Sequence, residues 1–407
     1  MILILFILPG YLLAQPDYTF QYPFSQSAEA GSDFHLLLHR EISACRDYLL
    51  PSRVFSNNSF LSEAGNVTCR LLLLGSLDFY LAYLPVVNQH EYFGHLGRAK
   101  QLDAGFTRYQ IYFFPPTGGR AYWGDHRFHQ LTNAERMLEI AGGIEANSIM
   151  AGDISRKVLQ KEKINFHESM LLLGAGSDMV TYLLFEEETS YNDIDQYLQI
   201  INQDRMPGEN IEKGDLIWPA TISFFTNPIV LHSIYNLARD YICRGRKETK
   251  LWLINGNGRI NYLPYAGYAL TPTGPVISLN SYLIKGDKQY KISVGHGFPW
   301  KIRHTEVGIS AYQIRILPES LATDLEFRGW SGDGFPMHDQ RGSIIPSGKI
   351  GGLASLDLYC RLPVGPYKGR LPVIMGGVYI KTKGYSAGYM LQEGIGFKIG
   401  AGYFFIE

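Results

Sequence analysis

The chain has 407 residues and a formal net charge of −1, which excludes the basic excess of a nucleic-acid-binding protein and the acidic runs of a disordered one. Its length is sufficient for two domains, each with its own core. Only 18% of the residues are charged, whereas there are 27 Tyr and 43 Gly, which are most frequent in the C-terminal part.

The first 14 residues have the composition of a secretory signal peptide. An apolar segment runs from Ile2 to Leu13, and the small residue Ala14 precedes Gln15 at the expected cleavage position. This segment is too short for an ordinary membrane-spanning helix. It predicts export, and the alternative is a short buried or interfacial N-terminal segment.

Between residues 15 and 250 the apolar residues recur with a helical period, which predicts a mainly helical domain. Three long apolar runs are typical of helices deep in a globule or in a membrane: 71–87, 167–185 and 216–242. Thr132 and Glu135 form a T-x-x-E capping box, which predicts the start of a helix. Cys45 and Cys69 are near enough in sequence for a disulfide bond in an oxidising compartment, but unpaired buried thiols are equally consistent with the sequence.

The segment HEYFGH, residues 90–95, has the composition of a metal site. In H-E-x-x-H helices two histidines four residues apart bind zinc, and the glutamate acts as a base. Here His95 follows His90 by one residue more, which separates the two side chains by about 140° on a regular α-helix. A π-helical turn accommodates one additional residue, and Gly94 lies within the interval. We therefore predict that His90 and His95 bind Zn²⁺ with Glu91 beside them.

A third ligand is expected from the helix over residues 139–147. Glu139 shares a face with Glu135 and Arg136, so we expect its side chain to face solvent. Glu145 lies on a face of small and apolar residues, where a buried carboxylate needs a partner. A metal ion would be such a partner, so the sequence predicts Glu145 as the carboxylate ligand.

The pattern H-E-x-x-G-H with a glutamate downstream resembles the dipeptidyl peptidase III family of zinc peptidases. This resemblance implies that His90 and His95 are zinc ligands, Glu91 is the catalytic base and Glu145 is the carboxylate ligand. It covers six contiguous residues and one distant glutamate, and the family's second motif is absent around Glu145. The resemblance is limited to the arrangement of the site residues, which is that of the gluzincins, a broad group of zinc peptidases with a glutamate ligand. The apolar helix that leads into the motif also resembles that of the membrane-embedded site-2 proteases.

Zinc-dependent hydrolysis also requires a group that stabilises the oxyanion of the transition state. The segment AYWGDHRFHQ, between the two predicted ligand helices, contains Tyr122, His126 and His129 as candidates. We assign Tyr122 and His126 to this role, next to Glu91 as the general base. His126 and His129 could instead form a second metal site or lie at the surface.

From residue 251 to residue 407 the pattern changes to strict alternation, which predicts about eight strands. Ile395, Phe397 and Ile399 share one face of the last strand, whereas Lys398 and neighbouring glycines share the other. Such strands, with aromatic residues near their ends, are typical of a transmembrane β-barrel. Alternation does not determine which way the apolar face turns, so a soluble β-sandwich or lipocalin-like barrel is the alternative.

Together these patterns predict an exported α+β multidomain protein. It would have a signal peptide (1–14), a helical metallopeptidase-like domain (15–250) and an antiparallel β-barrel domain of about eight strands (251–407). The predicted function is zinc-dependent hydrolysis of a peptide or protein substrate. The barrel would contact lipid of a bacterial outer membrane, with the helical domain in the periplasm or at the surface, and no nucleic acid would be bound. The alternatives are a non-enzymatic outer-membrane protein without metal and a soluble secreted binding protein.

Overall fold

The computed structural model describes most of the chain after residue 26. The described residues are 27–50, 52, 54–55, 59–104, 106–111, 119–123, 130–185, 192–203, 205–206, 208–256, 260–286, 288–299, 302–317, 320–338, 343–346, 348–362, 370–389 and 393–405. The predicted signal peptide, His126 and His129 lie outside these residues.

The first part of the described chain is mainly helical, as predicted. Its α-helices are α2 (Ala28–Leu49), α3 (Phe60–Leu73), α4 (Phe79–Asn88), α5 (Leu96–Gln101), α7 (Asn133–Ile140), α8 (Gly142–Lys161), α9 (Phe166–Leu184), α10 (Asp193–Ile201), α11 (Lys213–Thr226) and α12 (Pro228–Tyr235). Three π-helical segments interrupt or extend them: η1 (Leu74–Asp78), η2 (Gln89–His95) and η3 (Asn236–Cys243). The capping box of Thr132 and Glu135 starts α7 and is confirmed.

The second part forms one large antiparallel sheet, which makes the protein α+β. The order of its nine strands is β15-β14-β13-β10-β9-β8-β7-β6-β5. These strands are β5 (Ile254–Gly256), β6 (Ile260–Thr271), β7 (Gly274–Lys285), β8 (Lys288–Gly297), β9 (His304–Leu317), β10 (Leu321–Gly332), β13 (Ile350–Arg361), β14 (Arg370–Lys381) and β15 (Gly394–Phe405). Among the described residues no pairing joins the two edge strands, β5 and β15, so the sheet is open between them. The predicted closed barrel is therefore not seen in this part of the chain.

Three small two-stranded sheets complete the fold. They pair β1 (Phe106–Ile111) with β2 (Gly119–Trp123), β3 (Lys163–Asn165) with β4 (Glu248–Lys250), and β11 (Pro336–His338) with β12 (Ile344–Pro346). The four cysteines are all unbonded, so the possible disulfide of Cys45 and Cys69 is not formed.

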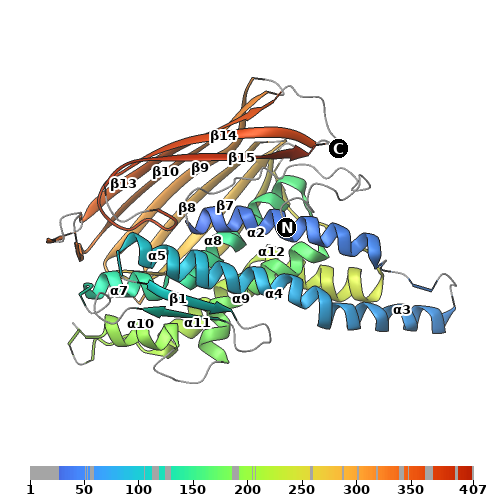
Figure 1. Ribbon diagram of the computed structural model, residues 1–407, viewed down its shortest axis with the longest axis horizontal. Coiled ribbons are helices and arrows are strands. Elements are labelled where there is room, and N and C mark those ends of the chain that lie inside the picture. The colour runs from blue at the N-terminus through green and yellow to red at the C-terminus, as the bar shows by residue number, and fades with distance from the viewer. Residues whose placement is uncertain are drawn as a thin grey trace.

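Helices and sheet share their hydrophobic cores. Figure 1 shows the sheet arching over the helices, with α2 and α8 beneath it. One core joins Tyr197 of α10 to Leu270 of β6, and a second joins Met150 of α8 to Tyr282 of β7. The change from helices to strands near residue 250 therefore does not separate two independent cores.

The large sheet is apolar on its outer face and polar on the face that covers the helices. On β15 the side chains of Ile395, Phe397 and Ile399 are 63%, 78% and 65% exposed. The alternate residue Lys398 points inward and forms an ion pair of 3.3 Å with Glu29 of α2. The direction of the apolar face, which the sequence left open, is therefore outward.

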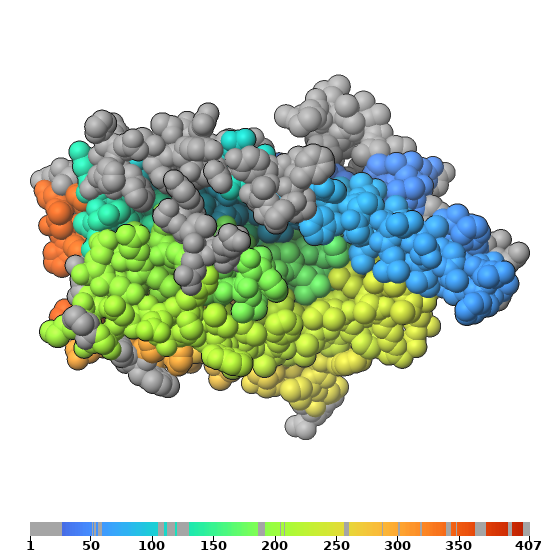
Figure 2. Space-filling model, turned by 90° about the horizontal axis from the view of Figure 1, so that it is seen from below, coloured from blue at the N-terminus to red at the C-terminus, as the bar shows by residue number. Residues whose placement is uncertain are grey.

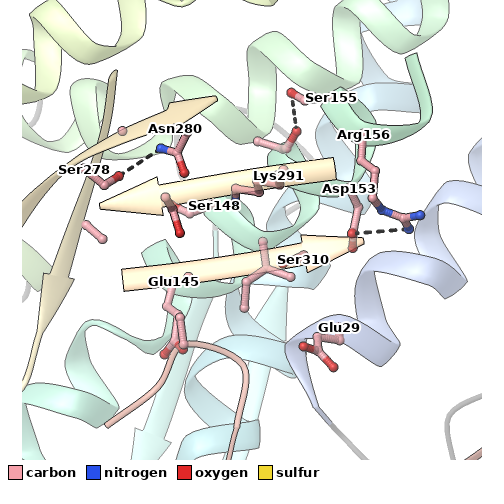
Figure 3. A pocket seen from close by; sticks show the side chains of 18 of the residues that line it. Glu29, Glu145, Ser148, Asp153, Ser155, Arg156, Ser278, Asn280, Lys291 and Ser310 are labelled. Atoms are coloured by element: carbon pink, nitrogen blue, oxygen red, sulfur yellow. Dashed lines mark hydrogen bonds and ion pairs between the residues drawn. The ribbon is translucent and has the colours of Figure 1, made fainter. Parts of the chain in front are cut away.

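The inner face of the sheet borders a cavity of about 430 Å³ that lies between the sheet and α8 and is lined by both polar and apolar side chains. Figure 3 shows Lys291 of β8 and Ser310 of β9 on the sheet side of this cavity, with Ser148 and Arg156 of α8 on the helical side. A polar interior under an apolar exterior is the reverse of a soluble β-sandwich, in which the apolar faces meet inside.

One helical run in the described chain is long and apolar enough to cross a membrane. It extends over 42 residues from Phe60 to Gln101 through α3, η1, α4, η2 and α5, and only 22% of its most apolar window is buried. This run and the large sheet are both compatible with a membrane protein.

Candidate metal centre

The HEYFGH segment adopts the π-helical turn that its spacing predicted. The π-turn η2 covers residues 89–95, and its wider helical repeat brings His90 and His95 to the same side of the helix. The two imidazoles converge, with 3.1 Å between their Nε2 atoms. The insertion of one residue relative to H-E-x-x-H is thus compensated by the backbone.

Glycines allow this turn to approach α8 closely. A Cβ atom at Gly94 would lie 2.6 Å from the Cα atom of Gly143, and one at Gly142 would lie 3.1 Å from the carbonyl oxygen of Gly94. The first distance is shorter than real Cβ contacts, and the second is tighter than most of them. The role of Gly94 is therefore close packing of two helices, beyond the local easing of the helix that its position suggested.

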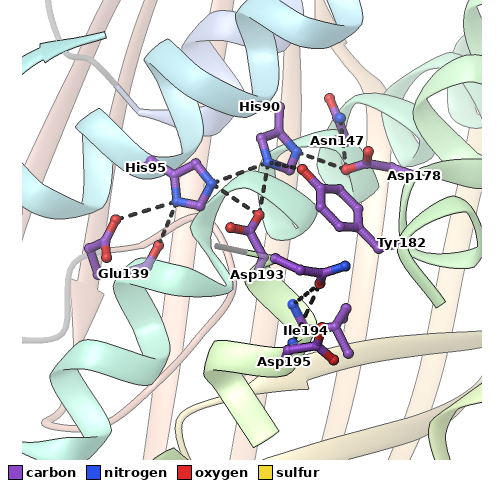
Figure 4. A network of polar contacts seen from close by, with 10 residues as sticks. His90, His95, Glu139, Asn147, Asp178, Tyr182, Asp193, Ile194 and Asp195 are labelled. Carbon is purple, nitrogen blue, oxygen red and sulfur yellow. Dashed lines mark hydrogen bonds and ion pairs between the residues drawn. The ribbon is translucent and has the colours of Figure 1, made fainter. Parts of the chain in front are cut away.

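The third member of the group is Asp193, at the start of α10. Its Oδ2 atom lies 3.1 Å from Nε2 of His90 and 3.2 Å from Nε2 of His95, as Figure 4 shows. The side chain of Asn192 caps α10 by accepting from the amide of Ile194, which fixes the position of Asp193. Acidic residues in a first helical turn usually interact with the helix dipole, so no pattern in the sequence distinguishes Asp193 as a ligand.

In each histidine the Nδ1 atom, which points away from the other histidine, forms a hydrogen bond that orients the ring. Nδ1 of His95 lies 3.0 Å from the carbonyl oxygen of Glu139, and Nδ1 of His90 lies 2.9 Å from Oδ2 of Asp178. In both contacts the oxygen accepts and Nδ1 donates, so an imidazole in its neutral form carries its lone pair on Nε2. Asn147 donates to the same carboxylate oxygen of Asp178 and holds it in place.

Three possible metal-ligand atoms therefore lie close together. The Nε2 atoms of His90 and His95 and Oδ2 of Asp193 form a triangle with sides of 3.1, 3.1 and 3.2 Å. Ligand atoms about 2.0–2.1 Å from a tetrahedral zinc ion are roughly 3.3 Å apart, so the triangle fits a metal ion. Such a cluster of acceptors requires a positive charge, from protons on the imidazoles or from a metal ion.

Tyr182 of α9 packs directly on the group. The ring of Tyr182 stacks on His90 with 5.6 Å between centroids, and its hydroxyl is 3.2 Å from Nε2 of His90. Burial alone would raise the pKa of Asp193, but the two imidazoles in their protonated form lower it below its ordinary value. Asp193 is therefore an anion, as a metal ligand must be.

Glu139 does not face solvent as the helical pattern indicated. Its side chain is fully buried, and Oε1 lies 3.3 Å from Nδ1 of His95. Burial raises the pKa of its carboxyl group to about 7. The expectation was wrong because the face of α7 that carries Glu135 and Glu139 is itself buried, with Glu135 2% exposed and paired with His338 of β11.

Glu145 is buried, as expected, but its partner differs from the predicted metal ion. Arg98 of α5 binds both carboxylate oxygens, with Nε at 2.9 Å from Oε2, and the amide of Gly388 donates to Oε1 at 2.8 Å. Both side chains of the pair are 5% exposed. Asp193 therefore takes the position in the group that the sequence assigned to Glu145.

Glu91 lies next to the histidines and beneath β2. It is 4% exposed, its Oε2 atom has no hydrogen-bond partner among the described residues, and Gly119 of β2 packs directly on its side chain. Tyr122 belongs to the same strand, of which the structure describes the backbone. His126, the other predicted catalytic residue, lies outside the described residues.

No known protein family, characterised protein or solved structure matches the chain. The function must therefore be inferred from the site itself. Its geometry establishes that His90, His95 and Asp193 could hold a metal ion, with Glu91 adjacent in the chain to one ligand.

Proposed function

We propose that the protein is a metal-dependent hydrolase of the cell envelope, with zinc as its metal. The observation that carries this proposal is the convergence of three possible ligand atoms, Nε2 of His90, Nε2 of His95 and Oδ2 of Asp193, within 3.2 Å of one another. Two imidazoles and one carboxylate form the donor set of many catalytic zinc sites, in which a further position remains open for water. A peptide bond as the target follows from the H-E-x-x-G-H resemblance alone.

Each residue of the site has a distinct task in this proposal. A bound zinc ion lowers the pKa of a water molecule and polarises a substrate carbonyl group. His90 and His95 bind through Nε2, while Asp178 and the Glu139 carbonyl hold the imidazoles in orientation. Glu91 takes a proton from water and returns it to the leaving group. Tyr122 and His126 remain the proposed donors to the oxyanion.

Anchoring in a lipid bilayer is the second element of the proposal. A soluble β-sandwich would turn its apolar face inward, whereas Leu279, Ile309 and Phe397 are 60%, 53% and 78% exposed on the outer face of three different strands. Strands β13, β14 and β15 have 12 residues each, which is sufficient to cross a hydrocarbon core. The predicted signal peptide favours the bacterial outer membrane.

The first experiment is the metal content of protein purified without a His tag, measured by mass spectrometry. We expect about one zinc ion per chain in the wild type and none in Asp193→Ala or His95→Ala, because each removes one of three ligands. Glu145→Ala is the matched control: it removes a buried carboxylate of the same neighbourhood and should leave the metal in place. Circular dichroism must show that each variant is folded.

A peptidase assay then tests catalysis separately from binding. Glu91→Gln should retain zinc and lose hydrolysis, since the amide cannot accept the proton. If the wild type takes up no metal even after reconstitution, the group is a proton-bridged packing feature, and the non-enzymatic membrane protein becomes the better proposal.

A further inference from the structure

The helical part of the molecule exposes an apolar surface of its own. On α11 the side chains of Trp218, Ile222 and Phe225 lie on one helical face and are 71%, 52% and 50% exposed. No Asp, Glu, Lys or Arg occurs from residue 216 to residue 235, which covers most of α11 and all of α12. A helix that is polar on its solvent side would carry charges at these positions.

This apolar surface continues past α11 onto neighbouring helices. On α12 Leu231 and Ile234 are 49% and 39% exposed. Farther on, η3 packs against α3, with Nε of Arg70 donating to the carbonyl oxygen of Ile242 at 2.8 Å. Leu72 at the end of α3 is 66% exposed. Figure 2 shows these helices on one face, with the yellow-green surface of α11 and α12 beside the blue surface of α3.

The same surface is continuous with the outer face of the sheet. Trp252, which is 66% exposed, packs its ring 5.1 Å from that of Tyr235 at the end of α12. Two residues later the edge strand β5 begins at Ile254, which is 58% exposed. The apolar exterior therefore extends from the sheet around its edge to the helices.

The open edge of the sheet supports the same conclusion. Strand β5 has three residues, so it covers only part of the edge of the 12-residue strand β6. An unpaired edge inside a hydrocarbon layer leaves amide groups without partners, at a cost of several kcal/mol each. Helix α11 packs against β6, the strand next to this edge, and Leu216 of α11 shares a core with Leu270 of β6.

We propose that α11, α12 and the α3–η1 segment lie in the same lipid hydrocarbon layer as the outer face of the sheet. This inference rests on the proposed bilayer anchoring. It replaces a separate aqueous helical domain with one bilayer-embedded body, in which helices and sheet share a core and an apolar exterior. The candidate metal centre then lies within that body.

Spin labels report the environment of each surface directly. In a background in which the four unbonded cysteines are replaced by serine, single cysteines are placed at Ile222, Leu231, Ile309 and Glu209, and each labelled protein is reconstituted into phospholipid nanodiscs. Accessibility to oxygen, which concentrates in hydrocarbon, is compared with accessibility to a water-soluble nickel chelate. Ile309 represents the outer face of the sheet, and Glu209, an exposed loop residue, is the aqueous control.

We expect high oxygen and low nickel accessibility at Ile222 and Leu231, equal to that at Ile309, and the reverse at Glu209. A lipid-like signal at Ile309 with a water-like signal at Ile222 and Leu231 would overturn the inference but leave the anchoring intact. Water-like signals at all three positions would refute the anchoring as well. Protection of Ile222 and Leu231 from both reagents would identify a second protein copy as the occupant and would also overturn the inference.

Discussion

Replacement of Gly143 by alanine should remove the metal from the protein without unfolding it. Gly143 lies on α8 directly against the imidazole of His90. A Cβ atom there would overlap Nε2 of His90 and lie 2.5 Å from its Cδ2 and Cε1 atoms, whereas ordinary contacts begin at 3.4 Å. The imidazole must therefore move by about 1 Å to restore van der Waals contact.

Such a movement is large enough to break a metal–ligand bond, but its cost is small relative to the free energy of unfolding. Metal–ligand distances tolerate about 0.2 Å, so a displacement of about 1 Å removes His90 from the coordination sphere. Overpacking costs about 1–3 kcal/mol, and alanine regains about 1 kcal/mol of helix propensity over glycine. The net loss of about 0–2 kcal/mol is smaller than a typical unfolding free energy of about 5–15 kcal/mol.

The assay is zinc content, together with affinity from competition with a chromogenic chelator and thermal unfolding by circular dichroism. Gly152→Ala on the same helix is the matched control, because no atom lies within 4 Å of its added Cβ. We expect it to keep its metal and to gain about 1 kcal/mol. Wild-type zinc affinity in Gly143→Ala would refute the assignment of His90 as a ligand.

Three further predictions test the surroundings of the site and the membrane face. Asp178→Ala removes the acceptor that orients His90 and should weaken zinc binding about 10–100-fold in chelator competition; unchanged affinity would exclude that role. Glu145→Gln leaves the buried charge of Arg98 uncompensated and should lower the unfolding free energy by about 3–5 kcal/mol with zinc retained, whereas loss of zinc would restore Glu145 as a ligand candidate. Phe397→Lys should destabilise the protein in lipid vesicles by about 2–4 kcal/mol relative to Phe397→Leu, if its 78% exposed side chain lies near the bilayer centre; equal stability would place β15 outside the hydrocarbon.

The site residues that are close together in the sequence could be predicted from the sequence. His90, Glu91 and His95 lie within one short helical segment, and a π-turn such as the structure contains brings histidines five residues apart to one side. Asp193 could not be found in this way, since it reaches His90 from another helix, 103 residues away. Its neighbour Asn192 signals only that a helix begins.

Glu139 of α7 and Glu145 of α8 show that the burial of a carboxylate and the identity of its partner depend on different features of the protein. A carboxylate on a small, apolar helical face predicts burial, and Glu145 is buried. Its partner is decided by which side chain packs opposite, and that is Arg98. For Glu139 even the exposure was misjudged, because its face of α7 packs inside the protein, where Glu135 pairs with His338 of β11.

The sequence by itself determined the strands and their two faces, because side chains alternate across a strand whatever surrounds it. Only the tertiary structure decided that Ile395, Phe397 and Ile399 point outward and that Lys398 points to Glu29. The periodicity of a sequence shows which residues share a face of one helix or strand, but not what that face contacts. The direction of a face, the third member of a metal group and the partner of a buried charge depend on contacts between elements far apart in the chain, which no local pattern encodes.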